Sequence, residues 1–532
     1  MADRTSVGRT SLVLAHRRRQ SPGSHSGTRH SARADRPHPR HHGLTDHGPG
    51  EPSMHPQSGA SFVQIDERPL NRRQKGLITA AVLGTMLEFF DFFIVAFILT
   101  VVSGPWHLTF GQSAFILLTA GVGAIIGSFV FGALADRWGR RKMFMATILI
   151  FSIGTGALAL VPEGGWLIFG LLRLLVGFGV GGLIVVDVPL VQEFVPSSRR
   201  GFLGALVVMF VPLGSLLGSA SAAFLGPLIG WRGLVLLGLL PALVSIYVRT
   251  QVPESPTWLI RQGRPEDARR SVAWILDIPA SEVILPESVE ESRSRWRDMF
   301  RYRRSVGFTW LNSLAVQMAY YGINLWGPTL IAMTMGTSPA DAAFLFIFVS
   351  LAGFVGRIVG ARASDVFGRR RTGLAAMLGA TVAIVAIALF HGETIGGVAL
   401  FYPILIIGWA FLDASFSVGL PYWSEMFPTS IRASGVGAAY GFGGLGKIVG
   451  PAALAVISGA GTVLTPKATS DAIGPAFWFF AIFALLAALT YIWPAIETKG
   501  KSMAELDALH EAQVRTPSGR RTADRPQVTS SS

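Results

Sequence analysis

The sequence predicts an all-α integral membrane protein in which twelve transmembrane helices form two pseudo-symmetric six-helix bundles. Half of the 532 residues are hydrophobic and only 15% are charged, which is less charge than a soluble chain of this length exposes. The apolar residues fall in blocks of about 20, the length at which a helix crosses a bilayer. Two polar motifs of the first half of the chain recur in the second half. Together these observations indicate a duplicated membrane bundle.

Five regions follow from the positions of the apolar blocks. Residues 1–75 are rich in Arg, His, Ser, Pro and Gly and predict a disordered cytoplasmic tail. Residues 76–250 and 305–496 each hold six apolar segments, 251–304 form a polar cytoplasmic linker with short helices, and 497–532 form a second cytoplasmic tail. The predicted helices are 77–102, 113–135, 143–161, 166–190, 202–226, 233–250, 305–333, 340–363, 372–390, 397–423, 435–457 and 474–494, with 265–276 in the linker.

The loops carry their basic residues on one side of the predicted membrane. Clusters such as 140–142, 199–200 and 369–371 lie on the side of the tails and the linker, whereas the other side carries little beyond Arg232 and Lys467. The positive-inside rule then predicts a multi-pass protein of the plasma (inner) membrane with both termini in the cytoplasm. The net charge of +14 does not indicate nucleic-acid binding, because the basic residues lie in loops and tails between apolar blocks.

Two unrelated motifs repeat at nearly the same offset. The pattern Asp-Arg-Trp-Gly-Arg-Arg begins at Asp136, and Asp-Val-Phe-Gly-Arg-Arg begins 229 positions later at Asp365. The pattern Glu-x2-Pro-x3-Arg begins at Glu193 and again 232 positions later at Glu425. Nearly equal offsets indicate two homologous six-helix halves. Parallel halves around a midplane site are the architecture of a carrier that rocks between two states.

These residues resemble the major facilitator superfamily, over roughly residues 75 to 506. Gly132 to Arg141 resembles the hallmark loop of that superfamily, and the second copy departs from it at Ala361 and Val366. Three further motifs are similar to the sugar-porter branch, which also includes carriers of aromatic acids, nicotinate and other metabolites. They are R-L-L-V-G-F-G-V-G at 173–181, P-E-S-P-T-W-L at 253–259 and E-T-K-G-K-S at 497–502.

The resemblance does not extend to the sugar-binding residues. Sugar porters place a Gln on the fifth helix, a Gln pair on the seventh and a Trp on the tenth. Here the fifth helix has no Gln, the seventh has Gln317 alone, and the tenth has Leu420 at the Trp position. The pattern L-E-F-F-D-F-F at 87–93 is instead similar to the first helix of proton symporters for organic acids.

Ionisable residues inside the predicted helices are candidates for function, because an unpaired charge at the centre of a bilayer costs at least about 2.5–3.5 kcal/mol. Glu88 and Asp91 are spaced i, i+3 and share a face of the first helix. The resemblance aligns Asp91 and Arg173 with the Asp–Arg pair that couples proton to solute. The alternative for Asp91 and Arg173 is a static structural ion pair, and for Glu88 a satisfied polar residue between helices.

Further polar residues are candidates for binding the solute. Asp187 and Asp413 lie on helices four and ten, which line the cavity in the resembled fold, and Lys447 lies near the midplane of helix eleven. We expect Lys447 and Asp413 either to form a structural pair or to supply a counter-charge to the substrate. Arg357 is predicted to be structural. On helix seven the candidates are Gln317, Tyr320, Tyr321, Asn324 and Trp326, which suit a planar or aromatic solute.

The repeated loop motifs predict a cytoplasmic gate. We expect carboxylate–guanidinium pairs there to form when the protein is open to the outside and to break when it is open to the inside. The alternative is that the arginines only determine topology. The candidate gate residues are Asp136, Arg137, Arg140, Arg141, Glu193, Arg200, Asp365, Arg369, Glu425 and Arg432.

Transport is therefore the predicted function. We expect a proton-coupled symporter of a small organic acid or related metabolite that works by alternating access, as a monomer, driven by the proton gradient without a cofactor or metal. A sugar or polyol symporter, or a drug exporter, is the alternative within the class, and a transport-inactive sensor of the same fold is the alternative outside it. An enzyme is not expected, because the sequence shows no nucleophile–base pair, metal-ligand cluster or phosphate-binding loop. The glycines at 177, 179 and 181 lie inside a membrane helix and indicate packing.

Overall fold

The fold was analysed in a computed structural model of the chain. It describes residues 63–66, 69–196, 206, 209–243, 251–286, 296–493, 496–501 and 503–515. Most of the predicted N-terminal tail and the end of the C-terminal tail lie outside these ranges. Within them the chain is almost entirely helical, and nine helices are long and apolar enough to cross a membrane. The prediction of a twelve-span helical membrane protein is confirmed.

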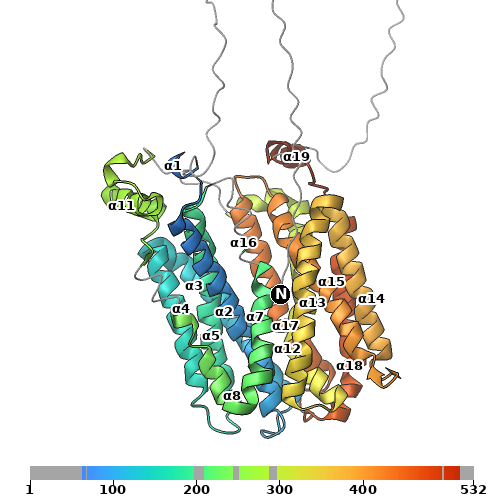
Figure 1. Cartoon of the computed structure of the whole chain (residues 1–532). Coiled ribbons are helices and arrows are strands. Elements are labelled where there is room, and N and C mark those ends of the chain that lie inside the picture. The colour runs from blue at the N-terminus through green and yellow to red at the C-terminus, as the bar shows by residue number, and fades with distance from the viewer. Residues whose placement is uncertain are drawn as a thin grey trace, which may run out of the picture. The chain divides into compact units, whose positions relative to one another are not determined.

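The described part of the first half comprises six α-helices and one short π-helix, which Figure 1 shows in blue to green. Helices α2 and α3 each begin with a capping box, at Asn71 and Thr109, in which side chain and backbone satisfy each other's free donors. From Val211 to Leu237 the chain is helical except at Gly230, whose φ of 66° interrupts the helix. The elements are α2 (Arg72–Val102), α3 (Phe110–Trp138), α4 (Arg140–Leu158), α5 (Trp166–Glu193), α7 (Val211–Ala220), the π-helix η1 (Ser221–Leu225) and α8 (Gly226–Leu237).

The second half repeats this plan. Its elements are α12 (Arg303–Met335), α13 (Pro339–Phe367), α14 (Arg369–Phe390), α15 (Phe401–Glu425), α16 (Arg432–Gly443), α17 (Gly446–Ile457) and α18 (Pro466–Ile492). A short hairpin of β1 (Thr394–Ile395) and β2 (Val398–Ala399) joins α14 to α15, with Thr394 opposite Ala399. The predicted span 435–457 is interrupted between α16 and α17. There Leu445 donates to Phe442 and Lys447 to Gly444, the i to i−3 hydrogen bonds of a tighter turn.

Short helices lie at one end of the bundle, which we call the linker end. They are α1 (Val63–Asp66), α10 (Pro256–Arg261), α11 (Pro265–Leu276), the 3₁₀ turns η2 (Ala280–Glu282) and η3 (Trp296–Arg301), and α19 (Met503–Arg515). Figure 1 shows α1, α11 and α19 at this end. The predicted linker helix 265–276 is confirmed. Helices α1 and α19 fall in regions that the sequence predicted as tails.

The two halves contact each other at the opposite end, which we call the far end. Backbone hydrogen bonds join the start of α3 to the loop before α18: Phe110 donates to Thr462 at 3.0 Å and Gly111 to Ala460 at 2.9 Å. Nearer the linker end, Thr100 and Thr329 hydroxyls lie 3.0 Å apart. These bonds satisfy polar groups that have no water partner inside a membrane protein. Hydrogen bonds therefore join the two halves at the far end.

Glycine allows α3 and α5 to pack closely. A Cβ added at Gly177 would lie 2.0 Å from the carbonyl oxygen of Ala120, and one at Gly181 would lie 1.9 Å from that of Ala124. Any side chain larger than hydrogen would push these helices apart, as in other small-residue contacts between membrane helices. The prediction that this glycine pattern serves helix packing is confirmed.

Candidate functional site

The first buried ion pair lies in the first half. Asp91 on α2 and Arg173 on α5 are both fully buried, and Arg173 Nη1 lies 3.6 Å from Asp91 Oδ2. The guanidinium also donates to the backbone carbonyls of Asp91, at 3.4 Å, and Phe92, at 3.2 Å. Neither carboxylate oxygen of Asp91 has a hydrogen-bond partner among the described residues. The pair is thus a loose contact, in which the arginine is held mainly by carbonyls.

Two other residues define the surroundings of Asp91. Glu88 lies one turn earlier on α2 and is buried as well. Gly238, at the end of α8, leaves no room beside the carboxylate, because a Cβ there would lie 2.5 Å from Asp91 Oδ1. The backbone after α8 therefore packs directly against the acid.

The second buried ion pair lies in the second half and corrects an expectation. Asp413 on α15 pairs with Arg357 on α13 through Nε and Oδ1 at 2.6 Å, and both side chains are buried. The expected pair of Asp413 with Lys447 does not form. The rotation of α13 and α15 turns Arg357 and Asp413 toward each other, whereas Lys447 faces Tyr321.

Lys447 is buried between two tyrosines. It is the second residue of α17, directly after the break in this span. Its Nζ donates to the Tyr440 hydroxyl at 3.2 Å and lies over the rings of Tyr321, at 5.1 Å, and Tyr440, at 4.8 Å. No ion pair joins Lys447 to a carboxylate of the described residues. Aromatic faces attract a cation but do not neutralise it.

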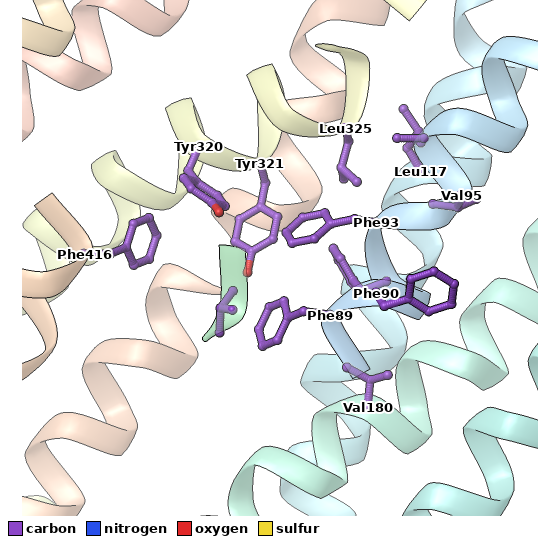
Figure 2. Packing of buried hydrophobic residues seen from close by; sticks show 14 of the residues in the cluster. Phe89, Phe90, Phe93, Val95, Leu117, Val180, Tyr320, Tyr321, Leu325 and Phe416 are labelled. Atoms are coloured by element: carbon purple, nitrogen blue, oxygen red, sulfur yellow. The ribbon is translucent and has the colours of Figure 1, made fainter. Parts of the chain in front are cut away.

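Aromatic rings from both halves surround Tyr321. Figure 2 shows its ring between Phe89 and Phe93 of α2 on one side and Tyr320 on the other. The ring of Phe92 meets Tyr321 edge-on at 5.7 Å, and that of Phe93 stacks on it at 6.4 Å. In Figure 2 the Tyr321 hydroxyl points toward Phe89. Lys447 is thus placed beside flat apolar surfaces from both halves.

The other candidates on α12 divide into two groups. Gln317 Nε2 donates to Ser313 at 2.9 Å, while Gln317 Oε1 and Asn324 Nδ2 are buried and have no partner among the described residues. Tyr320 packs on Trp409 at 4.7 Å, beside the Arg357–Asp413 pair. A polar solute could form hydrogen bonds with these two unpartnered amide atoms.

Two candidates fall elsewhere. Trp326 donates its indole N–H to the Pro451 carbonyl at 3.0 Å and packs on Phe110 at 5.8 Å, so it belongs to the far-end contact and not to the surroundings of Lys447. The side chain of Asp187 lies outside the described residues, although α5 includes its position.

In the first half, two glutamates hold the turn between α3 and α4. Arg140 Nη1 pairs with Glu193 Oε1 at 2.7 Å, which joins the start of α4 to the end of α5. The Glu254 carboxylate accepts the backbone N–H of Arg141 at 2.9 Å, and Ser255 donates its hydroxyl to Glu193 at 2.5 Å. The segment after the sixth span is thereby fixed to the hallmark loop.

The second half repeats these contacts. Arg369 Nε pairs with Glu425 Oε1 at 3.4 Å, Glu497 accepts the backbone N–H of Arg369 at 3.0 Å, and the Thr498 hydroxyl donates to Glu425. In both halves a positive-φ glycine precedes the arginine, Gly139 (φ 102°) and Gly368 (φ 95°). A Cβ added at Gly139 would also lie 2.4 Å from Glu254 Oε2. These turns need glycine for their backbone and for the nearby carboxylate.

Four residues of these two clusters were not among the site residues predicted from the sequence. Glu254 with Ser255, and Glu497 with Thr498, occupy corresponding positions at the ends of the two halves. A repeated pair of Glu followed by a hydroxyl residue, in motifs already noted for other reasons, was the available signal.

The remaining gate candidates do not join one network. Arg432 reaches Asp507 of α19 at 3.8 Å and the Ser424 carbonyl at 3.0 Å instead of Glu425, which corrects the expected grouping. Asp365 pairs with Arg369 at 3.0 Å. Arg141 lies beside the Glu254 carboxylate, Asp136 and Arg137 are exposed, and Arg200 lies outside the described residues. The ion pairs Arg140–Glu193 and Arg369–Glu425 each join elements of one half, and they are present while hydrogen bonds join the two halves at the far end.

The described residues include no group of three or more His, Cys, Asp or Glu side chains that could hold a metal ion. The buried pairs and Lys447 offer the binding of charges and protons.

The sequence matches the family model described as "Sugar (and other) transporter" over residues 77–510. It is 31% identical to a niacin transporter of Acinetobacter baylyi over 453 residues, which covers 83% of this chain and 98% of that protein. It is 29% identical to a putative niacin/nicotinamide transporter of Bacillus subtilis, covering 81% and 98%. A cis,cis-muconate transport protein of Acinetobacter baylyi is 25% identical, covering 72% and 87%.

Solved structures share the fold. A proton:xylose symporter of the major facilitator superfamily, bound to 6-bromo-6-deoxy-D-glucose, superposes with a TM-score of 0.61 at 22% identity and covers 82% of this chain and 98% of its own. A bacterial homologue of the lysosomal transporter Spinster, in an inward-facing conformation, gives 0.61 at 15% identity, covering 85% and 100%.

Proposed function

Because the chain belongs to the sugar (and other) transporter family of the major facilitator superfamily, we propose that it is a proton-coupled symporter of a small organic anion. It is a multi-pass membrane transporter and not an enzyme. From the positions of the basic loops we also propose that the linker end lies on the cytoplasmic side of a plasma membrane. The monomer is the proposed working unit.

The surroundings of Lys447 support an anionic solute. Among the residues that the structure describes, Arg173 and Arg357 are also cations buried inside the bundle, and each pairs with a carboxylate, whereas Lys447 contacts only tyrosines. A charge in a membrane interior is expensive unless it is paired. A solute carboxylate would supply the missing partner. The surrounding rings of Phe93 and Tyr321 would pack against a flat solute, and the free amide groups of Gln317 and Asn324 would bind its polar atoms.

The names of the relatives support the same class of solute. Niacin is a planar pyridine carboxylate, and cis,cis-muconate is an extended dicarboxylate. Both bear the negative charge that Lys447 would pair with. A planar aromatic monocarboxylate fits the aromatic surroundings of Tyr321 best.

Asp91 is the proposed proton carrier. Its carboxylate is fully buried, makes only the 3.6 Å contact with Arg173, and has no hydrogen bond from the described residues. Such a carboxylate gains or loses a proton when its distance from the arginine changes. Movement of α2 against α5 between the two states of the carrier would make that change. No cofactor is needed for this cycle.

Uptake into proteoliposomes tests the proposal. One proton carried with one monoanion moves no net charge, so nicotinate uptake should follow an imposed pH gradient and ignore an imposed valinomycin potential. A neutral solute carried with one proton would move a charge worth about 2.3 kcal/mol per 100 mV, or roughly 50-fold accumulation. Asp91→Asn should abolish pH-driven uptake but retain nicotinate exchange, which needs no net proton release.

Lys447→Gln tests the anion site. Loss of a charge-assisted hydrogen bond worth about 1.5–3 kcal/mol should raise the KM for nicotinate roughly 10- to 100-fold. Nicotinamide has the same ring without the charge, so its uptake, if present, should change little. Lys467→Gln, which removes an exposed lysine at the far end, is the matched control. Potential-driven uptake of an uncharged sugar that is unaffected by Lys447→Gln would refute the organic anion and leave the transporter class intact.

A further inference from the structure

A hollow of about 620 Å³ lies outside the membrane bundle of the first half, at the linker end. Its walls are the start of α4, the segment 251–254, and helices α10 and α11. Four basic side chains line it (Arg141, Lys142, Arg264 and Arg270), against two acidic ones (Glu254 and Asp267). We call this feature the basic hollow. It shares Arg141 and Glu254 with the clusters at the linker end, and it includes none of the residues around Lys447.

The two carboxylates of the basic hollow are already engaged. Glu254 accepts the backbone N–H groups of Arg141 and Ser255, each at 2.9 Å. Asp267 is shared by Arg264 and Arg270, with one guanidinium nitrogen of each at 2.5 Å. One carboxylate therefore neutralises only one of these two arginines, and the hollow keeps a net positive charge. An anion is the ligand that this charge favours.

Lys142 is the most available of these cations. It is exposed and forms no ion pair with the described residues. Residues at i, i+7 and i+11 share one face of a helix, so Lys142 shares a face of α4 with Leu149 and Ile153. These two apolar side chains are 45% and 64% exposed. In a membrane protein an exposed apolar face of a spanning helix contacts lipid, so the hollow opens next to the bilayer surface.

Tryptophans also lie at or near the basic hollow. Trp258 and Trp274 line the basic hollow, and Trp138, at the end of α3, is half exposed close to it in sequence. Trp258 donates its indole N–H to the Asp136 carbonyl at 2.9 Å, which holds α10 against the end of α3. Tryptophan prefers the depth of the lipid headgroups. The basic side chains of the hollow therefore lie at headgroup level.

We propose that the basic hollow binds a phosphate group, supplied by the headgroup of an anionic phospholipid. Lys142, Arg264 and Arg270 bind the phosphate oxygens, and the lipid chains lie along Leu149 and Ile153. A soluble organic phosphate offers the same chemistry without the chains. This site is independent of the solute and of the coupling ion, so it does not rest on the proposed function.

Native mass spectrometry of the purified full-length protein tests the site. The protein is mixed with phosphatidylglycerol, with phosphatidylcholine, or with glycerol 3-phosphate, and the bound fraction is measured. Each basic residue near a membrane surface contributes about 1 kcal/mol to the binding of anionic lipid. The triple variant Lys142→Gln, Arg264→Gln, Arg270→Gln should therefore bind phosphatidylglycerol at least roughly tenfold more weakly than wild type.

Two further variants make the test specific. Asp267→Asn removes the competing carboxylate and should strengthen phosphatidylglycerol binding. The matched control, Arg301→Gln, Arg303→Gln, Arg304→Gln, removes three exposed arginines at the same end but outside the hollow, and should change binding little. All of these side chains are at least partly exposed, and an unchanged melting temperature checks that the variants are folded.

The outcomes separate the sources of the phosphate. If the wild type retains phosphatidylglycerol in preference to phosphatidylcholine, and the triple variant loses this preference, the result supports a lipid as the source of the phosphate. Binding of glycerol 3-phosphate without retention of phosphatidylglycerol supports the phosphate chemistry and overturns the lipid source. The proposal is overturned if the triple variant and the matched control weaken phosphatidylglycerol binding equally, or if the wild type retains the two lipids equally.

Discussion

The buried pair of Arg357 and Asp413 allows a quantitative test of what holds the second half together. The two charges are 2.6 Å apart, with side chains only 2% and 0% exposed. Water cannot easily replace a lost partner, because a Cβ at Gly353 would already lie 2.3 Å from Asp413 Oδ2. Removing one partner therefore leaves an uncompensated buried charge, at a cost of about 3–5 kcal/mol.

Replacing both partners should have a different effect. Arg357→Met and Asp413→Leu keep approximately the volume of the side chains and remove both charges. Such replacements are often neutral, or more stable by about 1–4 kcal/mol. Independent effects of the two single variants would instead add to a loss of about 6–10 kcal/mol. The double-mutant cycle should therefore show a coupling free energy of at least about 5 kcal/mol.

Denaturant titration of the purified protein in mixed micelles measures this cycle. Intrinsic tryptophan fluorescence is a suitable signal because Trp409 lies beside the pair: its Nε1 would be 2.8 Å from a Cβ at Gly353. Transport by the double variant should persist if the pair is structural. A double variant as unstable as the sum of the two single variants would refute this account of the pair. A stable double variant that no longer transports would show that the charges serve the cycle itself.

Two further predictions concern the linker end. Arg140→Ala removes the 2.7 Å pair with Glu193 and should impair transport, while the free energy of unfolding falls by no more than about 1 kcal/mol. The control is Arg261→Ala, which removes an exposed arginine of α10. Normal transport by Arg140→Ala would mean that Arg140 only determines topology. Burial lowers the pKa of His510 on α19 below its ordinary value of about 6.5, and its Nε2 lies 2.9 Å from the Glu425 carbonyl. Because the free helix then binds protons more readily than the docked one, docking should weaken as the pH falls below about 6.5. Hydrogen exchange of α19 should rise over that range in wild type and not in His510→Gln, and equal pH dependence in both would exclude His510 as the cause.

The sequence alone was sufficient for the fold class and the duplicated plan. A chain inside lipid must satisfy its backbone hydrogen bonds internally, so each long apolar block has to be a helix. The motifs at Asp136 and Asp365 revealed two halves before any contact was known. The linker helix 265–276 was also predictable, because its first turn is acidic, its polar residues alternate with apolar ones at helical spacing, and Pro265 suits a helix start.

Tertiary structure decided which charges meet. The sequence suggested Lys447 as the partner of Asp413, and only the rotation of α13, α15 and α17 selects Arg357 instead. The same holds for Glu254 and Glu497, which reach helix starts 113 and 128 residues away in the chain. The composition of a helix determines that it crosses the membrane. Its rotation about its own axis depends on close contacts with its neighbours, and that rotation determines whether a buried charge faces a carboxylate, a tyrosine or the solute.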